Sequence, residues 1–161
     1  MEKIVTIKLK PINSSNWEEC ANLNVSADQM SALPSNLFSI AELNFYPQTK
    51  AVAILNTKDK IIGFATYGTP ENEKVSKIFR LMIDEKHQGK GYGRAALTEI
   101  AKELFFKNNS DEIQVCYDPN RSSLKNFYGS IGFKEKELLP CKRRREGKML
   151  AVLSCDDFHF E

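Results

Sequence analysis

Residues that build metal sites and disulfide scaffolds are scarce in this chain. It has two histidines in 161 residues, and its four cysteines, Cys20, Cys116, Cys141 and Cys155, are scattered without a CxxC pair. A structural zinc site requires clustered Cys and His ligands, so this spacing argues against one. We therefore expect no metal site, and we expect free thiols, because disulfides are rare in cytosolic proteins.

Long apolar runs and an excess of charge of one sign are also missing. No stretch approaches the roughly 20 apolar residues of a membrane-spanning helix, and the N-terminus lacks the apolar region of a signal peptide. The net charge of +2 argues against a dedicated nucleic-acid binder. We expect a cytoplasmic protein that does not act at a membrane, with residues 1–161 forming a single domain.

Hydrophobic periodicity and turn residues predict a mixture of strands and helices. Strands are expected over residues 2–10, 50–56, 61–68, 75–84 and 112–117, then from residue 132 and over 148–153. Helices are expected over residues 16–23, 35–43, 94–107 and 122–131, the first capped by Ser14 or Ser15 and the second by Ser35. The order β-α-α-β-β-β-α-β-α-β-β indicates an α/β (α+β) fold, with a mixed central sheet of six to seven strands and helices on both faces.

A glycine-rich loop, QGKGYG at residues 88–93, joins a predicted strand directly to a predicted helix. Glycines adopt φ values that side chains disfavour, and the free N–H groups at a helix N-terminus attract an anion such as pyrophosphate. Lys90 and Arg94 add positive charge to this loop. The loop matches neither the P-loop pattern GxxxxGK[ST] nor the dinucleotide fingerprint GxGxxG, so an ordinary glycine-rich turn remains open as an alternative.

The spacing of Gln88, Gly91 and Gly93 resembles motif A of the GNAT N-acetyltransferases, whose consensus is Gln/Arg-x-x-Gly-x-Gly/Ala. Downstream, the segment NRSSLKNFYGSIGF resembles their motif B, with Tyr128 as its tyrosine and residues 132–133 as its Gly-Phe pair. The resemblance extends over about residues 4–153. The segments VSADQM, SNLFSIAE and GFATYG are similar to those of bacterial spermidine/spermine acetyltransferases.

This resemblance implies a single GNAT-type domain with a V-shaped splay between the fourth and fifth strands. The gap would admit the pantetheine arm of acetyl-CoA, and a backbone N–H around Met82 would polarise the thioester carbonyl. The implied cofactor-binding residues are Leu81, Met82, Ile83, Gln88, Gly89, Lys90, Gly91, Tyr92, Gly93, Arg94 and Asn120. No metal is implied.

The resemblance also implies catalytic roles for two side chains. Tyr128 would act as the general acid that returns a proton to the leaving thiolate, since a phenol stays protonated at neutral pH. Its alternative is a core tyrosine beside Phe127. The family commonly has Asn seven residues before this tyrosine; here that position is Arg121, so either Asn120 or Arg121 would take the role.

The general base is less closely defined by the residues. Glu42 is the candidate we retain, because its helix borders the acceptor site in the family. Asp28, Glu73 and Glu85 are the alternatives, each with a solvated carboxylate as its ordinary interpretation. We expect His87 to be an exposed loop histidine.

The predicted function is acetyl transfer from acetyl-CoA to a primary amine by direct attack, with a polyamine as the leading acceptor. The alternatives are another amine (an aminoglycoside, an amino acid or a protein amine) or a non-catalytic CoA-binding module. The basic run at residues 142–145 is expected to be a solvated turn, although it would repel a polycation if it lined the acceptor site. Family members often dimerise, so a homodimer is a further expectation.

Overall fold

The computed structural model describes residues 4–25, 35–142 and 144–159, which belong to two compact units. Unit 1 contains Met1–Gly68 and Arg80–Ile100, and unit 2 contains Thr69–Phe79 and Ala101–Glu161. No helix within the described ranges is long and apolar enough to cross a membrane. The four cysteines are free, with Cys20 buried and Cys116 exposed.

Two short helices of unit 1 begin at different kinds of cap. The helix α1 (Trp17–Ala21) has Asn16 as its N-cap, not the predicted Ser14 or Ser15. The reason is local: the N–H and hydroxyl of Ser15 both donate to Asn13 Oδ1, at 2.8 and 2.6 Å, so this serine closes the preceding turn. The helix α3 (Asn36–Glu42) confirms the predicted Ser35 cap, whose Oγ accepts a hydrogen bond from the Phe38 N–H at 3.1 Å.

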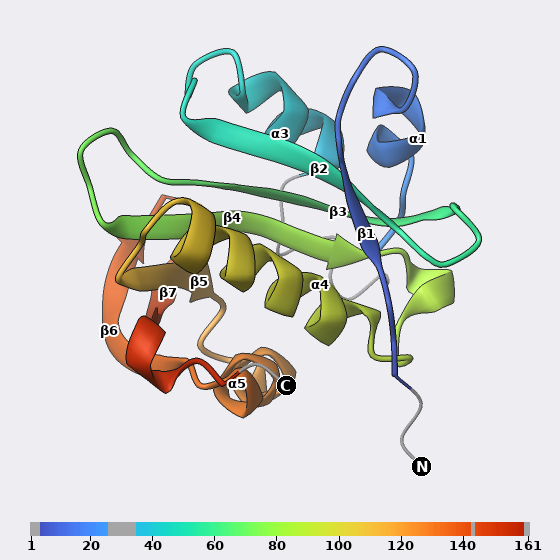
Figure 1. Ribbon diagram of the computed structural model, residues 1–161. Coiled ribbons are helices and arrows are strands. Elements are labelled where there is room, and N and C mark those ends of the chain that lie inside the picture. The colour runs from blue at the N-terminus through green and yellow to red at the C-terminus, as the bar shows by residue number, and fades with distance from the viewer. Residues whose placement is uncertain (1–3, 26–34, 143, 160–161) are drawn as a thin grey trace. The chain divides into compact units, whose positions relative to one another are not determined.

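The strands of unit 1 form an antiparallel meander (Figure 1). The strand β1 (Lys8–Pro11) pairs with β2 (Thr49–Leu55), and β2 pairs with β3 (Ile61–Gly68). The predicted hairpin is confirmed. Of the strand predicted at residues 2–10, residues 2–3 lie outside the described residues, and β1 begins only at Lys8. Every residue of β3 is buried, so this strand is the centre of the unit's apolar core.

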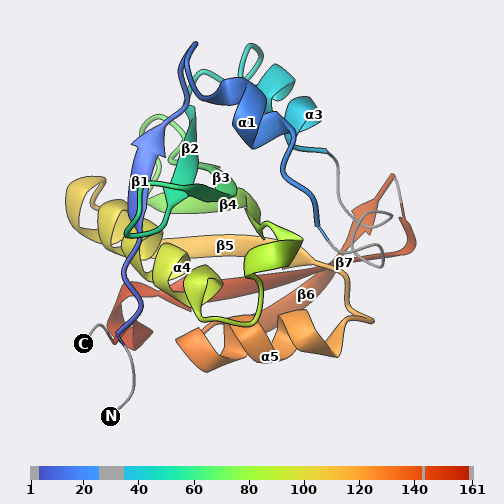
Figure 2. The ribbon, with the colours of Figure 1, turned by 90° about the vertical axis from the view of Figure 1, so that its right-hand side faces the viewer.

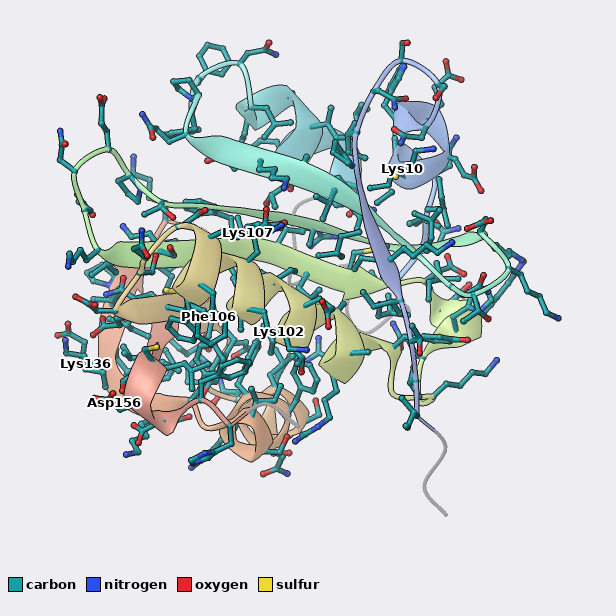
Figure 3. The ribbon with its side chains drawn as sticks, in the orientation of Figure 1. Lys10, Lys102, Phe106, Lys107, Lys136 and Asp156 are labelled. Atoms are coloured by element: carbon teal, nitrogen blue, oxygen red, sulfur yellow. The ribbon has the colours of Figure 1, made fainter. Side chains whose placement is uncertain are left out.

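One strand and one helix continue from one unit into the other. In β4 (Val75–Ile83), residues 75–79 belong to unit 2 and residues 80–83 to unit 1. The helix α4 (Tyr92–Lys102) begins two residues before the predicted start, and its chain continues as a π-helical turn at Glu103–Lys107. Figure 3 labels Phe106 and Lys107 on this turn, where the Phe106 ring is exposed.

The strands of unit 2 are β5 (Glu112–Tyr117), β6 (Lys134–Cys141) and β7 (Arg144–Ser154), with β7 antiparallel to both of the others. The helix α5 (Ser122–Ile131) has the predicted bounds and lies against this sheet (Figure 2), where the Tyr128 ring stacks on Tyr117 of β5. Gly132 ends the helix with φ 119°, a conformation that favours glycine.

The strands form a seven-stranded mixed sheet, within the predicted six to seven strands, and their hydrogen-bonded order is β1-β2-β3-β4-β5-β7-β6. The β4 and β5 strands are parallel, and their ladder consists of the pairs from Val75↔Glu112 to Lys77↔Gln114. The predicted splay between the fourth and fifth strands stays a prediction.

Candidate active site

The residues that follow β4 form hydrogen bonds with two other segments of unit 1, at Ile62 and at Asn24. The Asp84 N–H donates to the Ile62 carbonyl at 2.8 Å, and Asp84 Oδ1 accepts a hydrogen bond from the Asn24 N–H at 2.9 Å. The Glu85 N–H donates to the Asn24 carbonyl at 2.7 Å. These hydrogen bonds were not predicted from the sequence, because Asp84 and Asn24 are far apart in the chain. The local sequence shows only that Asp84 can cap the 3₁₀ turn Glu85–His87.

The Gln88 side chain links the start of the glycine-rich loop to β4 by a hydrogen bond. Its side-chain Nε2 donates to the Ile83 carbonyl at 2.9 Å, so the amide group bridges the end of β4 and the first residue of the loop. This contact holds the loop close to the strand end. The structure therefore gives the Gln88 side chain an internal bond in the loop, in addition to the predicted contact with the cofactor.

Two of the three loop glycines have the backbone conformation that their residue type allows. Gly89 has φ 74° and Gly91 has φ 86°, both in the left-handed region. A Cβ at Gly89 would meet open space, whereas one at Gly91 would lie 3.2 Å from Val5 Cγ2. Gly93 differs from the expectation, because α4 already begins at Tyr92 and includes it in the first turn.

The N-terminus of α4 presents backbone donors. The Ala95 N–H donates to the Gly91 carbonyl at 3.1 Å, so the N–H groups of Tyr92, Gly93 and Arg94 come before this first intrahelical bond. The exposed side chains of Lys90 and Arg94 add positive charge here. A diphosphate fits this arrangement, since the N–H groups of a helix N-terminus, the helix dipole and two cations all favour an anion.

The last residues of β4 come next to this loop in the chain. Met82 and Ile83 are buried and Leu81 is half-buried. A Cβ at Gly63 of β3 would come within 2.6 Å of the Met82 carbonyl oxygen, so the backbones of these two strands approach closely here. The predicted pantetheine contacts thus lie on a strand whose backbone position is tightly determined.

Tyr128 lies in an aromatic cluster of unit 2. Its ring stacks on Tyr117 at 5.5 Å between centroids, and meets Phe127 and Phe133 edge-on at 5.1 and 5.4 Å. Burial raises the pKa of Tyr128 to about 12, so the phenol is protonated at neutral pH. Among the described residues, its hydroxyl has no hydrogen-bond partner, whereas the Tyr117 hydroxyl donates to Glu135 at 2.7 Å.

Asn120 and Arg121 have different positions at the start of α5. Arg121 is the N-cap, and its carbonyl accepts hydrogen bonds from the N–H groups of Leu124 and Lys125. Asn120 precedes the cap, in a turn where its N–H donates to Asp118 Oδ1 at 2.9 Å. The position that commonly holds Asn in the family is therefore the cap itself, and the role of Asn120 remains a prediction.

The structure places the carboxylate candidates on different elements of the chain. Glu42 is the half-buried last residue of α3, and Glu73 and Glu85 are exposed. Asp28 lies outside the described residues. His87 is half-buried, not exposed as expected, and its ring lies edge-on to that of Tyr92, with 6.4 Å between the centroids.

The basic run divides between a turn and a strand. Lys142 is exposed in the turn after β6, Arg143 lies outside the described residues, and Arg144 opens β7 opposite Cys141. The strand thus begins earlier than the predicted bound at residue 148. The described part of the chain contains no group of three His, Cys, Asp or Glu side chains placed to hold a metal ion.

The glycine-rich loop, the tyrosine helix and the strand order can be compared with known proteins. A model of the acetyltransferase (GNAT) family matches residues 16–133. The chain belongs to the GNAT family. A relative, the spermine/spermidine N(1)-acetyltransferase of Bacillus subtilis (strain 168), is 27% identical over 135 residues, covering 80% of this chain and 88% of the relative.

Solved structures of GNAT proteins share this fold at low identity. The spermidine N-acetyltransferase from Vibrio cholerae, in complex with CoA and spermine, has a TM-score of 0.77 and 16% identity, covering 94% of this chain and 97% of that chain. The ribosomal-protein-S5-alanine acetyltransferase from Vibrio fischeri has a TM-score of 0.73 and 19% identity, covering 98% of both chains. As a GNAT protein, the chain is an N-acetyltransferase with acetyl-CoA as its co-substrate.

Proposed function

We propose that this chain transfers the acetyl group of acetyl-CoA to a primary amine of a polyamine. The observation that carries the proposal is the loop after β4, where two glycines with positive φ lead into the N-terminus of α4 in a chain of the GNAT family. The names of the relatives from Bacillus subtilis and Vibrio cholerae support spermidine and spermine as the acceptors to test first.

Unit 1 supplies the groups that would bind the co-substrate. The N–H groups from Gly89 to Arg94 bind the diphosphate, and the Lys90 and Arg94 side chains offset its charge. The backbone of Leu81, Met82 and Ile83 pairs with the pantetheine arm, and an N–H around Met82 polarises the thioester carbonyl. These groups orient the acyl carbon for attack, which removes much of the entropic barrier of a bimolecular reaction.

The acceptor must lose a proton before it attacks, because a free alkylamine has a pKa near ~10. The neutral nitrogen then forms a C–N bond with the acyl carbon, the C–S bond breaks, and the sulfur leaves as a thiolate. Tyr128 gives its phenolic proton to this thiolate, and the phenolate regains a proton from the excess proton that the new amide nitrogen releases through water. The raised pKa keeps the phenol protonated before this step, and its hydroxyl has no partner among the described residues.

Glu42 is the proposed partner of the cationic acceptor. Its carboxylate is half-buried at the end of α3, where water screens a charge less than on an open surface. A polyamine carries several ammonium groups, so one can pair with this carboxylate while another amine reacts. In this role Glu42 binds the acceptor, and it can also accept the proton that the amine loses.

An amine panel tests the proposed function. The enzyme is assayed with acetyl-CoA for thiol release in the presence of spermidine, spermine, an aminoglycoside, free amino acids and peptides with a free N-terminus or lysine. We expect spermidine and spermine to give the highest kcat/KM. Polyamines that are inert beside another active amine would overturn the acceptor assignment, and binding of acetyl-CoA without turnover of any amine would indicate a non-catalytic module.

A further inference from the structure

A buried arginine of β4 has no carboxylate partner. Arg80 is 6% exposed, and its Nε donates to Asn36 Oδ1 at 3.0 Å. Its Nη1 atom is buried without any hydrogen-bond partner, and among the described residues no acidic side chain pairs with the guanidinium. Burial lowers the pKa of Arg80 to about 10, which still leaves the group charged at neutral pH.

This arrangement is costly for the folded chain. A buried charge is normally offset by an opposite charge or by hydrogen bonds from all of its donors. Among the described residues, Nη1 has neither a carboxylate nor any other acceptor. The hydrogen bond from Nε to Asn36 offsets only part of this cost, because Nη1 has no partner within the described ranges. A structural role therefore does not explain why an arginine stands at this position, whereas a ligand that supplies the missing acceptor does.

Arg80 shares a side-chain neighbour, Asn36, with Met82, the residue that we assign to the thioester. The Asn36 amide accepts from Arg80 Nε and also donates to the Cys20 carbonyl at 2.9 Å and to Met82 Sδ at 3.5 Å. Arg80 and Met82 lie on the same buried face of β4, because side chains alternate along a strand. All of these residues belong to unit 1, as do Leu81 and Ile83.

The chemistry of the two substrates decides which one can supply a hydrogen-bond acceptor for Arg80 Nη1. A polyamine consists of methylene and amine groups, so in its protonated form it offers only N–H donors and no oxygen. The reacting end of acetyl-CoA carries one carbonyl oxygen, which accepts hydrogen bonds and becomes negative as the C–N bond forms. A buried cationic donor is worth most against such a developing charge.

We propose that Arg80 binds the acyl oxygen of acetyl-CoA through Nη1 and stabilises the negative charge that this oxygen acquires when the amine attacks. The inference rests on the proposed function and adds a side-chain donor to the backbone N–H expected around Met82. Asn36 is then a positioning residue, which fixes the guanidinium through Nε and contacts Met82 at the same time.

The Arg80→Met variant tests this role by separating catalysis from stability. We expect kcat with spermidine to fall about 100-fold, as for the loss of one oxyanion donor, while the midpoint of thermal unfolding falls by a few degrees at most, because Asn36 Oδ1 loses its hydrogen bond from Nε. The dissociation constant of CoA, which lacks the acyl oxygen, should not change, whereas acetyl-CoA should bind at least about tenfold more weakly, in keeping with one lost charged hydrogen bond.

Two further variants complete the experiment. Added guanidinium chloride at low millimolar concentration should partly restore the kcat of Arg80→Ala, an effect that a structural defect would not show. Lys10→Met is the matched control, since it removes a positive charge from the exposed face of β1 (labelled in Figure 3) and should leave all four measurements unchanged.

The outcomes distinguish the two proposals. Unchanged kcat and unchanged acetyl-CoA affinity in Arg80→Met would overturn the role of Arg80, as would a fall in kcat accompanied by a fall in the unfolding midpoint much larger than the loss of the Asn36 hydrogen bond explains. A loss confined to acceptors that carry a carboxylate would assign Nη1 to the acceptor and overturn the acyl assignment. If the wild-type protein acetylates no amine, the proposed function fails, but the selective loss of acetyl-CoA affinity over CoA affinity still decides the Arg80 contact.

Discussion

Two tyrosines of one aromatic cluster differ in how their hydroxyl groups are used. Tyr117 donates to the Glu135 carboxylate, and burial together with this hydrogen bond raises the pKa of Tyr117. The Tyr128 hydroxyl has no partner among the described residues, and only burial raises its pKa. Of the two phenols, Tyr128 is therefore the one whose proton is free to move to a leaving group.

This contrast predicts different effects of the same substitution at the two positions. Tyr128→Phe should lower kcat by about 10²- to 10⁴-fold, because general acid catalysis is lost, with little change in acetyl-CoA affinity. Because a raised phenol pKa keeps the proton on oxygen as pH rises, the wild-type kcat should show no fall from this group until pH approaches about 12. Steady-state kinetics between pH 6 and 10 measure both effects.

Tyr117→Phe is the matched control for that experiment. It removes a hydroxyl that donates to Glu135, so it should cost about 1 kcal/mol of unfolding free energy while leaving kcat close to that of the wild type. Equal losses of kcat in the two variants would show that the cluster's packing, not the Tyr128 proton, supports the reaction.

At the scale of the element, the loop before α4 depends on backbone conformation more than on side chains. Gly91 combines φ 86° with a carbonyl that accepts the first hydrogen bond of the helix. Gly91→Ala should destabilise the fold by about 1–2 kcal/mol, the cost of a left-handed conformation for a residue with a Cβ. The same change should weaken acetyl-CoA binding, because the helix N–H groups shift; denaturant unfolding and calorimetric titration measure the two effects.

A glycine inside α5 offers the control for this change. Gly129 has helical surroundings, and a Cβ there would meet nothing within 4 Å. Gly129→Ala should therefore stabilise the chain by about 0.5–1 kcal/mol through helix propensity and leave acetyl-CoA affinity unchanged. If Gly91→Ala bound acetyl-CoA as tightly as the wild type, the loop would not be the diphosphate site.

At the scale of the whole molecule, local patterns predicted the elements and long-range contacts were missed. The bounds of β5 and α5 follow from periodicity and neighbouring turn residues, and the sequence reproduces both. The hydrogen bonds between Asn24 and Asp84 and between Arg80 and Asn36 join residues that are far apart in the chain, so no local sequence pattern predicts them. The predicted N-cap of α1 was also wrong, because Ser15 forms a hydrogen bond with Asn13 and Asn16 is the cap instead.

Acetyl-CoA binding should stabilise the whole chain against unfolding, because a ligand that binds only the folded state shifts the equilibrium by mass action. At a concentration of 100 times its dissociation constant, the gain is about 2.7 kcal/mol, which raises the unfolding midpoint by several degrees for a domain of this size. Thermal denaturation with and without acetyl-CoA measures the shift. Gly91→Ala should show a smaller shift at the same concentration, and Gly129→Ala the full one. Equal shifts in both variants, or none in the wild type, would contradict binding at the N-terminus of α4.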